Sequence, residues 1–182
     1  MKLSISNALI FLSTLITILS YFNNDLLSFG LNHFFLESGN YKVVILQFIL
    51  YSFLHGGIFH LLFNSLFLYI FGNQVEYIIG KRYYLIFFIF ITIFNGISLI
   101  FLTKIGTNTI GISGFGLAIL SFLTIYLYEK KDAEYKGGIT GIVLNILVGF
   151  SAKISLIGHL FGAIGGGIFY FIYKFLKSKS HL

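Results

Sequence analysis

The chain has 182 residues, of which 57% are hydrophobic and only 10% charged, and its mean hydropathy is +0.93. A soluble domain of this length could not cover so apolar a surface with polar side chains. The net charge of +6 could suggest a nucleic acid partner, but the basic residues lie between apolar segments. We therefore expect an integral membrane protein whose partner is the lipid bilayer and not a nucleic acid.

Apolar stretches near the twenty residues that cross a bilayer recur along the chain. We expect six helical spans: Leu3–Phe22, Ile58–Ile79, Tyr83–Thr103, Ile110–Tyr128, Ile139–Ala152 and Ile154–Leu176. The first lacks a small-residue cleavage site, so we expect a retained helix. A seventh apolar stretch, Val43–Leu54, is short and suits a re-entrant or interfacial element. The sequence predicts an all-α, polytopic membrane bundle that forms a single domain over residues 1–182.

The basic residues are distributed unevenly between the two sides of this bundle. If the N-terminus is cytoplasmic, nine basic residues lie inside and three outside, namely Lys2, Lys81, Arg82, Lys130, Lys131, Lys136, Lys174, Lys177 and Lys179 against Lys42, Lys104 and Lys153. This asymmetry follows the positive-inside rule and predicts that both termini are cytoplasmic.

The longest outer connection, residues 23–42, has turn signals around a partly apolar centre. We expect it to form short interfacial helices and to leave His33 solvated. His181, in the C-terminal tail, is also expected to be solvated.

Three polar residues share one depth in three different spans. His60 lies about 24 Å above Glu76, Ser113 about 24 Å above Glu129, and His159 about 22 Å above Lys174, at a rise of about 1.5 Å per residue. These three helices run in the same direction, so the heights are comparable and place the three residues just below the outer surface. Asn64 follows one turn below His60. A polar side chain in hydrocarbon is costly, so these residues are candidates for a functional site.

Glycines could bring two of these helices together. Gly162 and Gly166 lie on the same stripe as His159, and with Gly158 they form a ladder of small residues that permits close backbone approach. The span with Ser113 offers Gly114 and Ala118 at matching spacing. Taken alone, this pattern indicates helix packing only; with Ser113 and His159 beside it, packing would bring hydroxyl and imidazole together.

The small inventory of reactive side chains narrows the chemistry. Cysteine is absent, and none of the six carboxylates lies mid-membrane. His-Glu-x-x-His is absent as well, so we expect no metal and no cofactor. The remaining nucleophile with a base is Ser113, whose hydroxyl would need the imidazole of His159. Without a carboxylate at that depth, the arrangement would be a dyad.

Acyl transfer also requires donors for a developing oxyanion. Asn64 and the backbone N–H of Ser113, at a helix start, could supply them. His60 could be a further donor, or equally an interhelical hydrogen-bonding residue. His55 is expected to brace the loop before this helix.

These segments resemble the rhomboid intramembrane serine proteases, over about residues 41–173. The resemblance rests on four motifs: Phe53-Leu-His55-Gly-Gly-Ile-Phe-His60-Leu-Leu-Phe-Asn64, Gly72 with Glu76, Gly111-Ile-Ser113-Gly114, and His159-x-x-Gly162-x-x-x-Gly166. It implies a catalytic Ser113 and His159, and an oxyanion hole formed by His60, Asn64 and the Ser113 backbone. It also implies packing support from Gly111 and Gly114, a gate near the short fifth span, and transmembrane protein substrates.

Two features depart from the family pattern. The chain has no Trp, so the Trp-Arg pair of the first loop is missing, and Tyr41-Lys42 lies near its place. Leu117 stands where some members carry a Tyr that stacks on the base, so another group must position His159, with Phe115 and Phe161 as candidates. The alternative functions are a proteolytically inactive protein that escorts membrane clients and a small channel or transporter. The absence of internal repeats disfavours a transporter.

Overall fold

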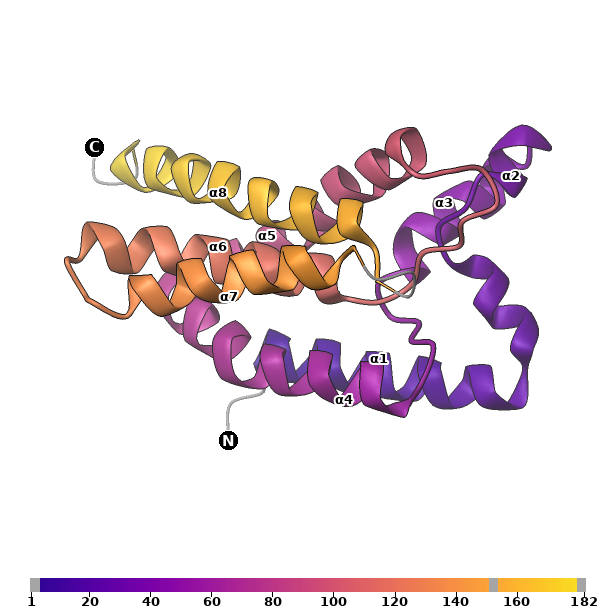
Figure 1. Ribbon diagram of the computed structural model, residues 1–182, viewed down its shortest axis with the longest axis horizontal. Coiled ribbons are helices and arrows are strands. Elements are labelled where there is room, and N and C mark those ends of the chain that lie inside the picture. Colours follow the sequence, from indigo (N-terminus) through magenta and orange to yellow (C-terminus); the bar gives the residue numbers. More distant parts are fainter. Residues whose placement is uncertain (1–3, 151–153, 180–182) are drawn as a thin grey trace.

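The computed structural model describes residues 4–150 and 154–179, and these form a bundle of helices (Figure 1). The elements are α1 (Ile5–Phe22), the 3₁₀ helix η1 (Asn24–Phe29), α2 (Phe34–Glu37), α3 (Tyr41–Leu50), α4 (Ile58–Phe67), the π-helical turn η2 (Leu68–Gly72), α5 (Asn73–Leu102), α6 (Ser113–Glu129), α7 (Tyr135–Val148) and α8 (Leu156–Lys179). An isolated antiparallel bridge joins Leu31 to Thr109. The predicted all-α class is confirmed for the described residues.

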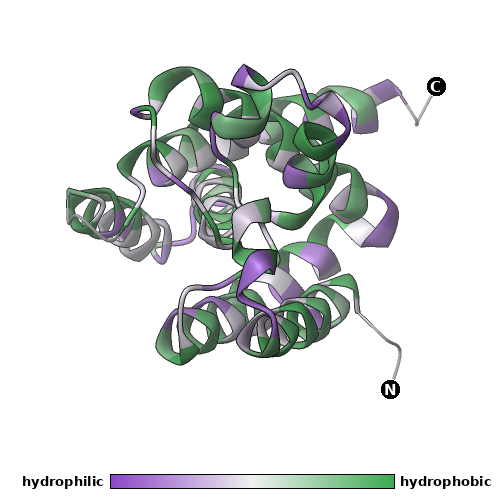
Figure 2. Cartoon of the chain, turned by 90° about the vertical axis from the view of Figure 1, so that its right-hand side faces the viewer, coloured by the Kyte–Doolittle hydropathy of each residue, from purple (hydrophilic) through white to green (hydrophobic). Residues whose placement is uncertain are grey.

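Three helical segments within these ranges are long and apolar enough to cross a membrane: Ile5–Phe22, Ile58–Leu102 and Leu156–Lys179. The second has 45 residues and is interrupted at Gly80, whose φ of 80° and ψ of 157° are not helical. Many large apolar side chains are exposed, and hydrophobic residues predominate along the helices (Figure 2). A soluble bundle would bury such a surface, so the chain is an integral membrane protein.

Three helices begin at different places from the expected spans. α8 starts at Leu156 instead of residue 154. α6 starts at Ser113 instead of residue 110, because Gly111 leaves the helical conformation with a φ of 115°. α7 starts at Tyr135 instead of residue 139, and there the glycine at 138 lies against the side chain of Thr124 on α6. Leu3, Ala152, Lys2, Lys153 and His181, which the sequence analysis used, lie outside the described residues.

The segment 23–42 folds onto the bundle through hydrogen bonds. η1 and α2 are the short helices that the turn signals predicted, and α3 follows them. The buried amide of Gln47 donates to the Gly30 carbonyl at 2.6 Å. The expectation that His33 is solvated is wrong: its side chain is half-buried, and its Nε2 donates to the carbonyl of Ile100 on α5 at 2.6 Å.

α6 is the central helix of the bundle, with an unbroken run of buried residues over 114–124. A helix that is apolar on all sides is expected where neighbours surround it. Around it, the Phe87 and Phe169 rings stack with centroids 4.4 Å apart, and Phe115 packs edge-on against Phe87 at 5.3 Å. This aromatic cluster joins α5, α6 and α8 below the level of the polar residues.

Glu76, on α5, attaches the start of α1 to the bundle through hydrogen bonds. Its buried carboxylate accepts hydrogen bonds from the backbone N–H groups of Ile5 and Ser6, both at 2.9 Å. These groups belong to the first turn of α1, which has no intrahelical partner for them. The Ser6 hydroxyl adds a bond to the Tyr84 hydroxyl at 2.8 Å.

Replacing Glu76 by Gln should therefore lower the free energy of unfolding in detergent by about 1–3 kcal/mol, because two charge-assisted bonds are weakened in a buried place. Thermal unfolding of purified protein measures the effect. Glu129→Gln is the matched control: Glu129 pairs with Lys174 at 2.7 Å on an exposed surface, so this variant should unfold like the wild type. Equal midpoints for both variants would show that the α1 contact contributes nothing.

Candidate active site

The loop before α6 places Ser113 at the first position of that helix. The Gly111 N–H donates to the Tyr51 carbonyl at 2.8 Å, and Thr109 exchanges backbone hydrogen bonds of 2.8 and 2.9 Å with Leu31. These bonds attach the loop before α6 to Leu31 and Tyr51. Since first-turn N–H groups lack intrahelical acceptors, the Ser113 N–H is a free donor beside its own hydroxyl.

His159 lies in the first turn of α8, which Ser155 caps. The Ser155 hydroxyl accepts from the Gly158 N–H at 3.1 Å, and the Ser155 carbonyl accepts from the His159 N–H at 3.0 Å. The His159 side chain is buried, and its Nδ1 is 2.9 Å from the backbone carbonyl of Asn145 on α7. A carbonyl only accepts, so Nδ1 carries the proton and Nε2 is left with a free lone pair.

The predicted glycine ladder forms the contact between α6 and α8. A Cβ at Gly162 would collide with the backbone carbonyl of Gly114, and a Cβ at Gly166 with that of Ala118. A Cβ at Gly114 would meet the Asn95 amide. The two backbones therefore touch without intervening side chains, and this contact sets the distance between Ser113 and His159.

One cavity of about 530 Å³ is lined by all four of the polar residues expected at this depth: Ser113, His159, His60 and Asn64. Gly111 and Gly114 also line it. Within residues 4–150 and 154–179, the Ser113 hydroxyl and the His159 imidazole line the same cavity but form no hydrogen bond with each other.

Asn64 and His60 lie against the loop that carries Ser113. A Cβ at Gly111 would be 2.7–2.8 Å from the His60 ring and 3.9 Å from Nδ2 of Asn64. That Nδ2 is buried and has no hydrogen-bond partner. An unsatisfied buried donor costs about 1–3 kcal/mol, so it is a donor available to a ligand.

His55 lies beside the cavity and not among its lining residues. Its Nδ1 donates to the Phe53 carbonyl at 3.2 Å, and its ring packs edge-on against His60 with centroids 4.9 Å apart. Thr17 of α1 contacts both Phe53 and His55, at 3.3 and 3.4 Å. His55 therefore holds the loop that precedes α4.

The sequence analysis missed three residues that line the cavity: Asn95, Asn145 and Tyr51. Asn95 is buried and its Oδ1 has no partner. Asn95 and Asn145 interrupt apolar spans as Asn64 does, so the same test of polar residues within apolar segments would have found them. Within the described ranges, no group of three or more His, Cys, Asp or Glu side chains could hold a metal ion.

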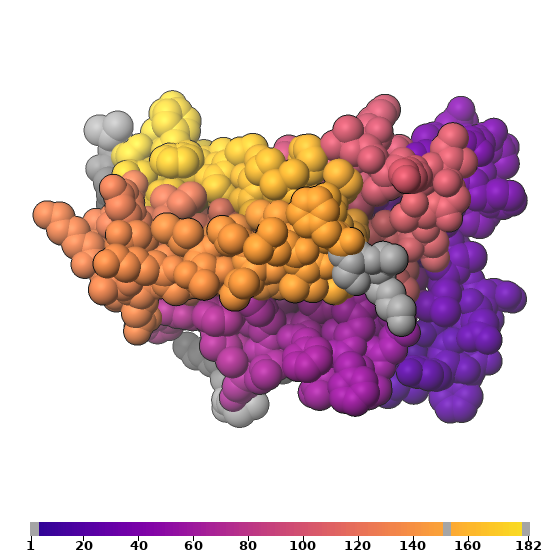
Figure 3. All heavy atoms as spheres, viewed as in Figure 1, coloured from indigo at the N-terminus to yellow at the C-terminus, as the bar shows by residue number. Residues whose placement is uncertain are grey.

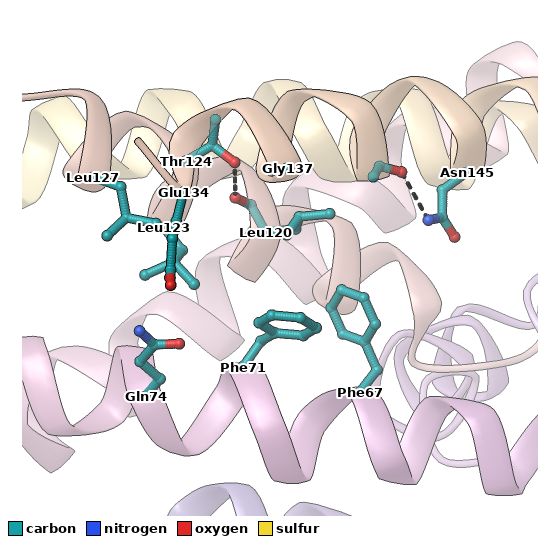
Figure 4. A pocket seen from close by; sticks show the side chains of 12 residues that line it. Phe67, Phe71, Gln74, Leu120, Leu123, Thr124, Leu127, Glu134, Gly137 and Asn145 are labelled. Carbon is teal, nitrogen blue, oxygen red and sulfur yellow. Dashed lines mark hydrogen bonds between the residues drawn. The ribbon is translucent and has the colours of Figure 1, made fainter. Parts of the chain in front are cut away.

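A second cavity, of about 480 Å³, lies between α4–η2 and α7, which are side by side on one face (Figure 3). Phe67 and Phe71 point into it from one side, and Leu123 and Leu127 of α6 from another (Figure 4). Asn145 lines this cavity as well as the one that contains Ser113.

The fold and this cavity define a helical membrane protein in which a serine, two histidines and an asparagine meet below one surface. The Rhomboid domain family matches residues 43–175, and the chain belongs to the rhomboid family. A curated relative is 31% identical over 124 residues, namely the "Putative rhomboid protease YdcA" of Bacillus subtilis (strain 168). This match covers 65% of the chain and 62% of the relative's length.

The α6–α8 contact predicts different outcomes for two glycines on α8. Gly162→Ala should destabilise the protein by about 1–3 kcal/mol, because the new methyl group must displace the backbone of α6. Gly167→Ala is the control, since its Cβ would meet only side chains at 3.5 and 3.7 Å. Unfolding midpoints in detergent compare the two, and a harmless Gly162→Ala would contradict the direct backbone contact.

Proposed function

We propose that this protein is an intramembrane serine endopeptidase that cleaves transmembrane segments of other membrane proteins with a Ser113–His159 dyad. The observation that carries the proposal is the single cavity shared by Ser113, His159, His60 and Asn64, in which the Asn64 amide is buried without a partner. Membership of the rhomboid family supports the same reaction class.

In the proposed reaction, Ser113 Oγ attacks the scissile carbonyl while Nε2 of His159 takes the hydroxyl proton. The two side chains must first close the gap between them, as catalytic hydrogen bonds often do on substrate binding. The imidazolium then gives its proton to the leaving amine. A water molecule, deprotonated by the same Nε2, hydrolyses the acyl-enzyme and restores Ser113.

The oxyanion that forms during the attack would be stabilised by Asn64 Nδ2, the Ser113 N–H and His60. Asn64 contributes a donor that already lacks a partner, so no existing bond has to break. Preorganised donors of this kind are worth most in a water-excluded site. The proposed dyad uses no carboxylate.

The proposed topology has six spans in a single domain, because the break at Gly80 divides the long α4–α5 segment into two. α1 begins at the same end of the bundle at which α8 finishes (Figure 1). The basic residues around Lys81, Lys130 and Lys174 would place that end in the cytoplasm. The catalytic cavity then opens toward the outer face, where substrates with small, helix-breaking residues would expose their scissile bond.

Serine-directed labelling tests this function. A fluorophosphonate should label the wild type, and Ser113→Ala and His159→Ala should lose both labelling and cleavage of a reporter transmembrane substrate while folding normally. Ser121→Ala, on the same helix, should behave as the wild type. Labelling that persists in Ser113→Ala would overturn the proposal, and unlabelled, inactive wild type would favour the escort-protein alternative.

Asn64→Ala should lower kcat for the reporter substrate by about 10²-fold, because one oxyanion donor is lost. Its KM should change little, since the donor acts mainly on the transition state. Asn73→Ala, outside the cavity, is the control. An Asn64→Ala enzyme with unchanged kcat would remove Asn64 from the oxyanion hole.

A further inference from the structure

We infer that the backbone carbonyl of Asn145, at the end of α7, is the group that orients His159, so that the base is competent only while α7 is seated against α6. This inference rests on the proposed function and names a positioning group for the same dyad. The group is a main-chain atom, and it belongs to a helix that carries none of the expected site residues.

The hydrogen bond between His159 and the Asn145 carbonyl determines which imidazole nitrogen carries the proton. Nδ1 of His159 and the Asn145 oxygen are 2.9 Å apart, within the range of a normal N–H···O bond. Because a carbonyl oxygen only accepts, this bond requires the proton on Nδ1 and leaves Nε2 unprotonated in the neutral ring. With Nδ1–H engaged, the unprotonated Nε2 is the only ring atom that can accept a proton from Ser113.

The Asn145 carbonyl can take this role because its oxygen has two lone pairs. It lies in the last turn of α7 and accepts one hydrogen bond from the Gly149 N–H at 3.2 Å, which leaves the second lone pair for Nδ1 of His159. The carboxyl end of a helix also carries a partial negative charge, which favours a positive group beside it. This end of α7 would stabilise the imidazolium that forms when His159 takes a proton, which is the task of the carboxylate in a triad.

The two aromatic candidates from the sequence are engaged elsewhere. The Phe115 ring packs against Tyr84, Phe87 and Phe88, and the Phe161 ring lies 6.2 Å from that of Phe94. In the part of the chain that the structure describes, neither makes a ring contact with His159. The Asn145 carbonyl is instead the group that forms a hydrogen bond with the His159 imidazole.

α7 is attached to the bundle through α6 and α8. None of its residues, 135–148, is fully buried. It packs on α6 through glycines, with Gly138 against Thr124 and Gly141 against Leu120. Its other side borders the cavity in front of Phe67 and Phe71 (Figure 4). A displacement of α7 that widens this cavity would carry the Asn145 carbonyl away from His159.

The carbonyl can be weakened without changing any side chain. Replacing Ile146 with its α-hydroxy acid converts the 145–146 amide to an ester, whose carbonyl is a poorer acceptor. We expect the fluorophosphonate labelling rate of Ser113 to fall about tenfold, the usual size of one such bond. The same replacement at Leu147 weakens the Ile146 carbonyl instead and is the matched control. Equal rates in both esters would overturn the inference.

Nitrogen-15 NMR of histidine reads the orientation independently of proteolysis. The His159 signals, assigned by their loss in His159→Gln, should show a protonated Nδ1 in the wild type and a mixture of tautomers in the Ile146 ester. A wild type protonated at Nε2 would overturn the inference even if the enzyme is active. A protein that shows protonated Nδ1 but never labels would instead contradict the proposed function alone.

Displacing α7 from its other contact tests the coupling. Gly138→Leu should push α7 off Thr124, slow labelling and disturb the His159 signals, although residue 138 lies outside the Ser113 cavity. Thr140→Leu, at an exposed position of the same helix, should leave both unchanged. If the Gly138→Leu variant is labelled at the wild-type rate and its His159 signals are unaltered, the orientation of His159 does not depend on the packing of α7 against α6.

Discussion

The backbone contact between α6 and α8 is the constraint on which the rest of the structure depends. Lipid removes most of the hydrophobic incentive for helices to associate, so close van der Waals packing of small residues must hold them. Gly162 and Gly166 allow the carbonyls of Gly114 and Ala118 to reach the opposite helix axis. The aromatic cluster that flanks this contact fills the wider spaces, and the serine and histidine lie just above it.

Much of this arrangement could be predicted from the sequence, because polar residues are costly inside membrane-spanning segments and therefore stand out among the apolar ones. Helix rise predicted that Ser113, His60 and His159 lie at one level, and all three line one cavity. The glycine ladder predicted which two helices would touch. The break at Gly80 lies between the expected spans Ile58–Ile79 and Tyr83–Thr103. The carbonyl that holds His159 could not be predicted in this way, because every residue has one and only the fold selects which is used. The burial of His33 was missed for a related reason, since its acceptor is also a main-chain oxygen.

The reliance on main-chain groups has a physical basis. An ionised carboxylate near His159 would have to be desolvated within the bundle, at a cost of several kcal/mol. A helix end offers part of the same negative potential with no net charge to desolvate. The carboxylate that the bundle does bury, Glu76, is compensated by the N–H groups at the start of α1, which is the complementary end of a helix dipole. Both buried charges, one permanent and one transient in the proposed reaction, would thus be matched by helix termini.

The π-helical turn η2 has a consequence for the rotational phase of the long segment from Ile58 to Gly80. Such a turn acts as one additional residue within an α-helix, and each residue advances the helix by about 100°. His60 and Asn64 precede it and face the cavity, whereas Glu76 follows it and faces α1. One residue fewer in Leu68–Gly72 would leave the first pair in place and rotate the carboxylate by about 100° away from α1. The π-helical turn therefore allows one continuous helical segment to place His60 and Asn64 in the cavity and Glu76 against α1.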